Sequence, residues 1–223
     1  MDAVKWLGLE PTDDPMKWRL PVTPGISTMG HFLFGGCGLG ATIGAMEGAT
    51  GRPIVWATAQ YLSYGRPGAV MDIDVTVPQS GRQTTQARAV GRVGDTEILT
   101  VNAALGARPL DLAGQWAQRP EVPDPDDCPH RTYRAEHANT LMTRLDQRLA
   151  LGREMDELDG TPTGAGRSAL WVRMPALLEM SGAALAILGD YVPFGIGQAL
   201  GQRAGGNSLD NTLLVARLVP TEC

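Results

Sequence analysis

The stretch KWRLP, from Lys17 to Pro21, decides the fold because the chain repeats it as WVRMP, from Trp171 to Pro175. Each copy is followed by an apolar segment rich in small residues, then by a strand-like run, then by a turn. Such self-similarity predicts a module that is present twice. The two apolar segments are Gly35 to Glu47 and Met180 to Val192, the two strand-like runs are Ile54 to Leu62 and Ser208 to Leu218, and the two turns are Arg66-Pro67-Gly68 and Val219-Pro220-Thr221.

The residues between Ala69 and Leu105 alternate between apolar and polar side chains in three runs that are separated by turn residues. This pattern predicts an antiparallel meander. The segment before it differs, because Leu39, Ile43 and Met46 have helical spacing and the intervening Gly and Ala residues allow close approach of neighbouring backbone. We therefore expect an α+β module in which an antiparallel sheet wraps around a central helix.

The second copy is shorter than the first in this sequence, since little follows its turn and the last three strands of the plan have no counterpart. An open sheet edge and an uncovered helix face favour association. We therefore expect a homo-oligomer or, as the alternative, a truncated product that folds poorly.

A segment rich in Pro and Asp separates the two copies, which favours an extended connection. The sequence thus predicts an N-terminal module over residues 1–107, a linker over 108–129, and an incomplete C-terminal module over 130–223. The pattern from His130 to Leu158 fits either a surface helix or a partial strand near Thr132-Tyr133-Arg134.

Composition excludes several classes of protein. The formal net charge is -5 and no Lys/Arg-rich run is present, which argues against a nucleic-acid partner. No apolar run is long enough to span a membrane, since the run from Ala183 to Leu188 ends at Gly189-Asp190. The three cysteines, Cys37, Cys128 and Cys223, have no paired spacing, and no secretion leader is seen, so we expect a cytoplasmic protein.

The sequence does not fully match several known motifs of catalysis and binding. Gly36 to Ala41 match G-x-G-x-x-A, but the meander that follows does not supply the parallel strands of a dinucleotide-binding unit. His31, His130 and His137 lack zinc-site spacing, and no G-x-S-x-G elbow occurs. The acidic group around Cys128 lies in the linker. The sequence therefore predicts neither a metal site nor a cofactor.

Asp210 is unusual because it lies in an otherwise apolar strand-like run, where the first copy has Ala59. Near the amino end of the second helix, a partly buried carboxylate could accept a proton from water that attacks a carbonyl group. The structural alternative is a carboxylate that caps a turn or pairs with Arg203 or Arg217.

Four segments together resemble the type II acyl-CoA thioesterases, whose subunit consists of two fused hotdog modules: FGGCGLGA from Phe34, the RPG turn, the G-R-x-x-x-x-A-R pattern from Gly81 to Arg88, and GGNSLDNTL from Gly205. The resemblance begins near Met16 and continues to the end of the sequence. It implies a double hotdog fold and the hydrolysis of fatty acyl-CoA to fatty acid and CoA. It also implies an acyl chain bound in an apolar slot between the modules.

In that family an Asp on the strand after the second helix acts with a Thr or Ser and a Gln from later strands. The resemblance assigns the first role to Asp210 and finds no counterpart for the other two. Backbone N–H groups at a helix start would receive the carbonyl oxygen, which nominates Gly35 and Gly36 at one helix and Ser181 and Gly182 at the other as substrate-binding residues.

Two alternatives remain open. The chain could be a non-catalytic module that binds acyl-CoA or serves in assembly, which the missing strands favour. It could also be an enoyl-CoA hydratase of the hotdog type, although such an enzyme needs a paired His and Asp that this sequence does not show.

Overall fold

The computed structural model describes residues 1–107, 114, 116–163, 166–176, 179–190 and 192–218. The turn predicted at Val219-Pro220-Thr221 lies outside the described residues. Within the described ranges, no helix combines the length and the apolar character needed to cross a membrane.

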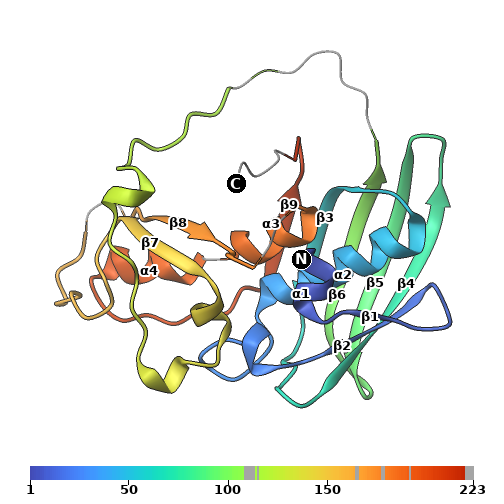
Figure 1. Ribbon diagram of the computed structural model, residues 1–223, viewed down its shortest axis with the longest axis horizontal. Coiled ribbons are helices and arrows are strands. Elements are labelled where there is room, and N and C mark those ends of the chain that lie inside the picture. Colours follow the sequence, from blue (N-terminus) through green and yellow to red (C-terminus); the bar gives the residue numbers. More distant parts are fainter. Residues whose placement is uncertain (108–113, 115, 164–165, 177–178, 191, 219–223) are drawn as a thin grey trace.

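A seven-stranded antiparallel sheet forms the largest part of the molecule, with the strand order β1-β2-β4-β5-β6-β3-β9 (Figure 1). Its strands are β1 (Glu10–Pro11), β2 (Lys17–Pro21), β3 (Ile54–Tyr61), β4 (Val70–Ser80), β5 (Thr84–Val93), β6 (Thr96–Gly106) and β9 (Asp210–Leu214). A separate two-stranded sheet consists of β7 (Asp146–Leu151) and β8 (Ala169–Arg173).

The helices are α1 (Ala3–Leu7), α2 (Gly35–Thr50), α3 (Gly182–Gly189) and α4 (Val192–Leu200). Short 3-10 helices lie at Pro24–Ile26, Pro125–Asp127, Ala135–His137 and Leu141–Arg144. Helix α2 lies across one face of the large sheet and α3 lies beside it, whereas α4 lies near the β7–β8 sheet (Figure 1).

The predicted meander is confirmed, and its alternation explains which face holds the helix. On β5, the side chains of Thr85, Ala87 and Ala89 are buried while those between them face outward. Because successive strand residues point to opposite faces, this single register places all the small side chains against α2. The hotdog architecture that the sequence indicates is therefore present in the first module.

Helix α2 is buried from Gly36 to Met46, as the absence of charge in this segment predicts. Because its glycines have no Cβ, the backbone of α3 can pack closely against it. A Cβ at Gly36 would lie 2.5 Å from the carbonyl oxygen of Ala186, and a Cβ at Gly40 would lie 2.9 Å from that of Ala183. Because Gly36 faces Ala186 and Gly40 faces the earlier Ala183, the two helices run antiparallel. The start of α2 therefore lies near the end of α3.

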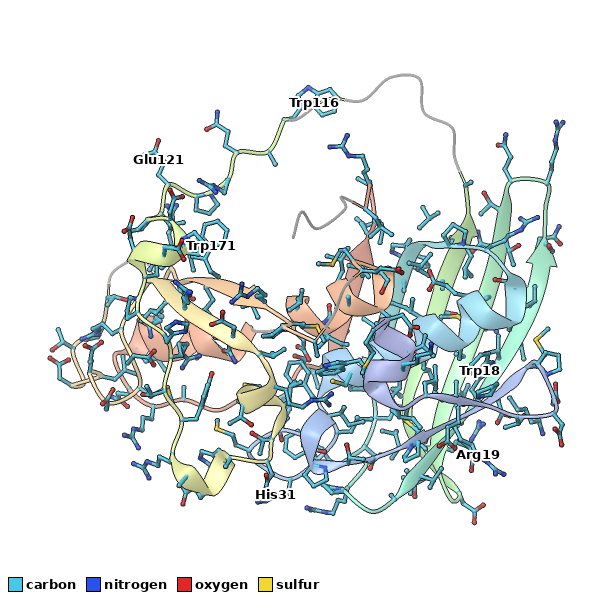
Figure 2. All side chains as sticks on the ribbon, viewed as in Figure 1. Trp18, Arg19, His31, Trp116, Glu121 and Trp171 are labelled. Atoms are coloured by element: carbon cyan, nitrogen blue, oxygen red, sulfur yellow. The ribbon has the colours of Figure 1, made fainter. Side chains whose placement is uncertain are left out.

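The pairing of β3 with β9 joins the two copies into one sheet. Thr58 lies opposite Thr212, and Gln60 lies opposite Asp210. Both copies of the repeated signature form strands, since Lys17–Pro21 is β2 and the second signature begins in β8. Figure 2 shows Trp18 and Trp171 on these two separate strands. The boundaries predicted for the two modules and the linker stay a prediction.

The segment from His130 to Leu158 differs from both sequence alternatives. It forms no long surface helix, and Thr132-Tyr133-Arg134 is not a strand. The strand in this segment is β7, where Gln147 and Leu149 point inward and the charged Arg148 between them points outward. A buried glutamine interrupts the apolar alternation, which is why the pattern did not reveal this strand.

Candidate functional site

A buried carboxylate lies at the junction of the two central helices. Asp190 follows the last residue of α3, and only 7% of its surface is exposed. Its Oδ2 accepts a hydrogen bond of 2.8 Å from the backbone N–H of Gly36, at the start of α2. Its Oδ1 accepts one of 3.3 Å from the hydroxyl of Ser208. Three segments that are distant in sequence therefore meet at this carboxyl group.

The start of α2 depends on Asp190 for its capping. The N-cap position is Phe34, whose side chain carries no hydrogen-bond acceptor, so the first N–H groups of the helix need another partner. A Cβ at Gly35 would lie 2.6 Å from Oδ2 of Asp190. Glycine at this position therefore makes room for a carboxylate that comes from the other copy of the module.

The environment of Asp190 favours proton transfer. Burial raises the pKa of this carboxyl group above its ordinary value, and the hydrogen bonds from Gly36 and Ser208 oppose the rise. The carboxylate is thus a stronger base than an exposed aspartate, while its two donors and the positive end of the α2 dipole stabilise the ionised form.

Tyr61, the last residue of β3, brings a hydroxyl group to the same place. A Cβ at Gly35 would lie 3.1 Å from its Oη. That oxygen is buried and forms no hydrogen bond that meets geometric criteria with the described residues. Burial raises the pKa of the phenol, Asp190 raises it further, and the Asn211 amide opposes the rise. An unmade hydrogen bond on a buried group costs about 1–3 kcal/mol.

Asp210 is placed differently from our expectation. It is the first residue of β9, opposite Gln60 of β3, and its side chain is exposed rather than partly buried. Among the described residues, neither Arg203 nor Arg217 forms an ion pair with it. The first position of an edge strand leaves this carboxylate in water, so the burial that motivated its selection is not observed. Its catalytic role stays a prediction.

The two predicted helix starts are present, but they lie at opposite ends of the helix pair. Gly35 begins α2 as expected. Ser181 is the N-cap of α3 and its hydroxyl accepts a hydrogen bond of 3.2 Å from the N–H of Ala184, while Gly182 faces the side chain of Ile54. The four residues nominated for substrate binding therefore do not form one site, and their binding role stays a prediction.

Comparison with solved structures places the chain in a family. A protein of Novosphingobium aromaticivorans, provisionally designated a thioesterase, is 30% identical, with a TM-score of 0.80 over 95% of this chain and 82% of that one. The chain belongs to the hotdog thioesterase family. This membership confirms the family resemblance that the sequence indicates.

Two further solved structures share the fold at lower identity. An acyl-CoA thioesterase II, TesB2, of Mycobacterium marinum is 19% identical, with a TM-score of 0.68 over 98% of this chain and 81% of that one. A hot dog fold protein of Alicyclobacillus acidocaldarius is 20% identical, with a TM-score of 0.78 over 92% and 75%. No protein-family model and no curated protein matches the sequence.

Sequence reasoning did not single out Asp190, Ser208 and Tyr61, which the structure brings together, although one signal for Asp190 was present. Asp190 is the lone charged residue between Met180 and Gly201. We used it only as the end of an apolar run. A single charge within a buried helical segment needs a partner, and here the partner is the start of the other central helix.

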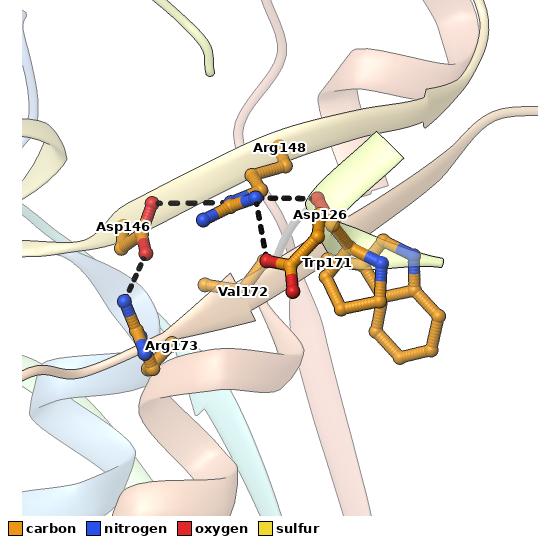
Figure 3. A pocket seen from close by; sticks show the side chains of 7 residues that line it. Asp126, Asp146, Arg148, Trp171, Val172 and Arg173 are labelled. Carbon is orange, nitrogen blue, oxygen red and sulfur yellow. Dashed lines mark hydrogen bonds and ion pairs between the residues drawn. The ribbon is translucent and has the colours of Figure 1, made fainter. Parts of the chain in front are cut away.

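A pocket of about 180 Å³ lies on the β7–β8 sheet (Figure 3). Its lining residues are Pro125, Asp126, Asp146, Arg148, Trp171, Val172 and Arg173. Its charged groups pair with one another: Arg148 Nη1 lies 3.2 Å from Asp126, and Arg173 Nη2 lies 2.7 Å from Asp146. These pairs leave no charge of either sign without a partner, so the Asp190 cluster is the better candidate.

Proposed function

We propose that this chain hydrolyses fatty acyl-CoA thioesters, with Asp190 as the general base. One observation carries the proposal: a buried carboxylate with a raised pKa lies at the start of a central helix in a fold that the chain shares with thioesterases. The substrate class follows from the acyl-CoA thioesterase II among the solved structures that share the fold.

In the proposed reaction, the oxygen of a water molecule attacks the thioester carbonyl carbon while Asp190 takes one of its protons. The carbonyl π electrons move onto oxygen, which gives a tetrahedral intermediate. The intermediate collapses, the C–S bond breaks, and the CoA thiolate receives the proton from Asp190. Fatty acid and CoA are the products, and no residue is consumed.

Ser208 and Gly36 would hold the base in position. Asp190 is fixed through both oxygens, by the hydroxyl of Ser208 and the N–H of Gly36. Because both donors bind the carboxylate, they orient its remaining lone pairs toward water. Gly36 is therefore proposed to act on the base, which differs from the expectation that its N–H receives the carbonyl oxygen.

The test replaces Asp190 by Asn, which keeps the shape and removes the base. Turnover of decanoyl-CoA, followed by free-thiol release, is expected to fall by about 10²- to 10⁴-fold, as for loss of a general base. The matched control is Glu47→Gln, since Glu47 is also a shielded carboxylate with a raised pKa and one backbone donor, the N–H of Ile54. That variant is expected to keep its activity.

The pH dependence provides a second readout. Because burial raises the pKa of Asp190, activity should fall, as the pH drops, at a higher pH than an exposed aspartate would give. The same shift makes the ionised form unfavourable in the fold. Above the ordinary carboxyl range, wild-type protein should therefore lose stability relative to Asp190→Asn as the pH rises.

Asp210→Asn completes the experiment because it tests the residue that the sequence nominated. If Asp210→Asn abolishes hydrolysis and Asp190→Asn does not, the proposal is wrong. Tight binding of decanoyl-CoA by wild-type protein without thiol release would instead favour the non-catalytic binding module. The expected homo-oligomer and cytoplasmic location stay predictions.

A further inference from the structure

The buried hydroxyl of Tyr61 has no assigned role in the mechanism above. It belongs to β3 of the first module, whereas Asp190 and Ser208 belong to the second. The backbone N–H of Tyr61 donates to the carbonyl oxygen of Leu209, which is the neighbour of Ser208. The strand pairing therefore fixes the position of Tyr61 relative to the residues that hold the base.

The proposed reaction needs a donor for the carbonyl oxygen, which gains negative charge during attack. The N–H of Gly36 is occupied by Asp190, so this residue does not supply the group as the sequence suggested. The hydroxyl of Tyr61 lies beside Gly35 and Asp190 and forms no hydrogen bond of good geometry with the described residues. A buried hydroxyl donor therefore lies beside the proposed base.

We propose that Tyr61 is a catalytic residue whose hydroxyl donates a hydrogen bond to the thioester carbonyl oxygen. This inference rests on the proposed function. The hydroxyl hydrogen stays on Tyr61 throughout, so the phenol loses no proton and the balance of the reaction is unchanged. Water supplies its proton to Asp190, and the CoA thiolate receives it when the C–S bond breaks.

Two features suit Tyr61 to this role. Burial and the negative Asp190 raise the pKa of the phenol, so it remains a donor at neutral pH. Its place beside Gly35 and Asp190 brings the hydroxyl next to the proposed base.

The test begins with Tyr61→Phe, which removes the oxygen and keeps the ring. The kcat/KM for decanoyl-CoA is expected to fall about 100-fold, as for loss of an oxyanion donor. Tyr133→Phe is the matched control, because it removes another shielded phenol, one that donates to Gln147. That variant is expected to keep wild-type turnover.

Binding of two inert analogues separates a catalytic role from a structural one. One analogue is the thioether of decyl-CoA, which lacks a carbonyl group, and the other is the ketone in which CH₂ replaces the thioester sulfur. Tyr61→Phe should bind the thioether as wild type does and the ketone about tenfold more weakly, as expected for one lost hydrogen bond. Equal weakening of both would show a structural role and overturn the proposal.

The outcomes distinguish this inference from the proposed function. If Asp190→Asn is inactive while Tyr61→Phe keeps wild-type turnover, only the role of Tyr61 is wrong. If Asp190→Asn keeps its activity, the proposed function fails as well. Should Tyr61→Phe not fold, replacement of Tyr61 by 3-fluorotyrosine keeps the shape and strengthens the donor. Tighter binding of the ketone alone is then expected, and unchanged binding overturns the proposal.

Discussion

The starts of α2 and α3 are built in opposite ways, although they belong to two copies of one module. Helix α3 is capped locally, because the Ser181 hydroxyl binds the N–H of Ala184 three residues later. Helix α2 has no local side-chain cap, and the N–H of Gly36 is served by Asp190, which is 154 residues away. A nearby serine can accept a hydrogen bond from the free N–H groups of a helix start. A distant carboxylate can do the same and can in addition accept a proton during a reaction.

The other ends of the same helices sharpen the contrast. Glu47 of α2 and Asp190 after α3 are both shielded carboxylates, and each accepts one backbone N–H. Glu47 accepts its hydrogen bond from the N–H of Ile54 at the beginning of β3. Asp190 has two hydroxyl groups, those of Ser208 and Tyr61, close to it. The two helix ends therefore differ in the hydroxyl groups that lie near the carboxylate, and not in whether the carboxylate is buried.

The largest effect in this comparison is expected from Gly36→Ala. A Cβ there would collide with the backbone oxygen of Ala186 and push α3 away from α2. Displacement of the base by about 1 Å should lower turnover roughly 100-fold, and overpacking should cost about 1–3 kcal/mol of stability. Chemical denaturation and thiol release measure the two quantities.

Gly182→Ala is the counterpart at the other start. Its Cβ would collide with Cγ2 of the buried Ile54, a β-branched side chain with little freedom to move, so a loss of stability with normal turnover is expected. If Gly182→Ala reduced turnover as much as Gly36→Ala, the two helix starts would have to be regarded as equivalent.

An intermediate effect is expected from Ser208→Ala, which leaves Asp190 with the N–H of Gly36 alone. The hydroxyl bond of 3.3 Å is long, so a decrease of roughly tenfold in turnover is expected, equal to about one hydrogen bond. Thr212→Val is the control, because it removes a hydroxyl from β9 that pairs with Thr58 at 2.9 Å on an exposed surface. A comparable decrease in the control would contradict a specific role for Ser208.

The smallest effect is expected from Ser181→Ala. Loss of the N-cap should cost about 1 kcal/mol of stability and leave hydrolysis unchanged. Thermal unfolding and thiol release are the measurements. A clear loss of hydrolysis would restore Ser181 to the substrate-binding role that the sequence suggested.

The sequence predicted the fold well in long segments whose pattern of apolar residues shows which side chains are buried. The alternation through β4, β5 and β6 and the unbroken apolar segment of α2 each specify one structure, because only one face can be buried. The tandem plan followed from the repeated signature. The strand β7 was missed because the buried Gln147 satisfies its amide through Tyr133 and Met142, a compensation that a hydropathy pattern does not reveal.

The site was predicted less well because its residues meet only in three dimensions. Gly35 and Gly36 were identified at the correct helix start. Asp210 was chosen for its contrast with Ala59, but strand pairing places it at an exposed position. Asp190 carries no local motif, and its significance comes from the antiparallel packing of α3 against α2, which composition and periodicity do not specify.

The pairing of β3 with β9 has a consequence for how activity arises during folding. Tyr61 and Ser208 occupy positions in or beside neighbouring strands that are far apart in the sequence. Such a non-local contact forms slowly compared with a meander of adjacent strands. Refolding molecules should thus acquire most of their sheet first and their capacity to cleave thioesters last, which makes catalysis a sensitive reporter of the final docking step.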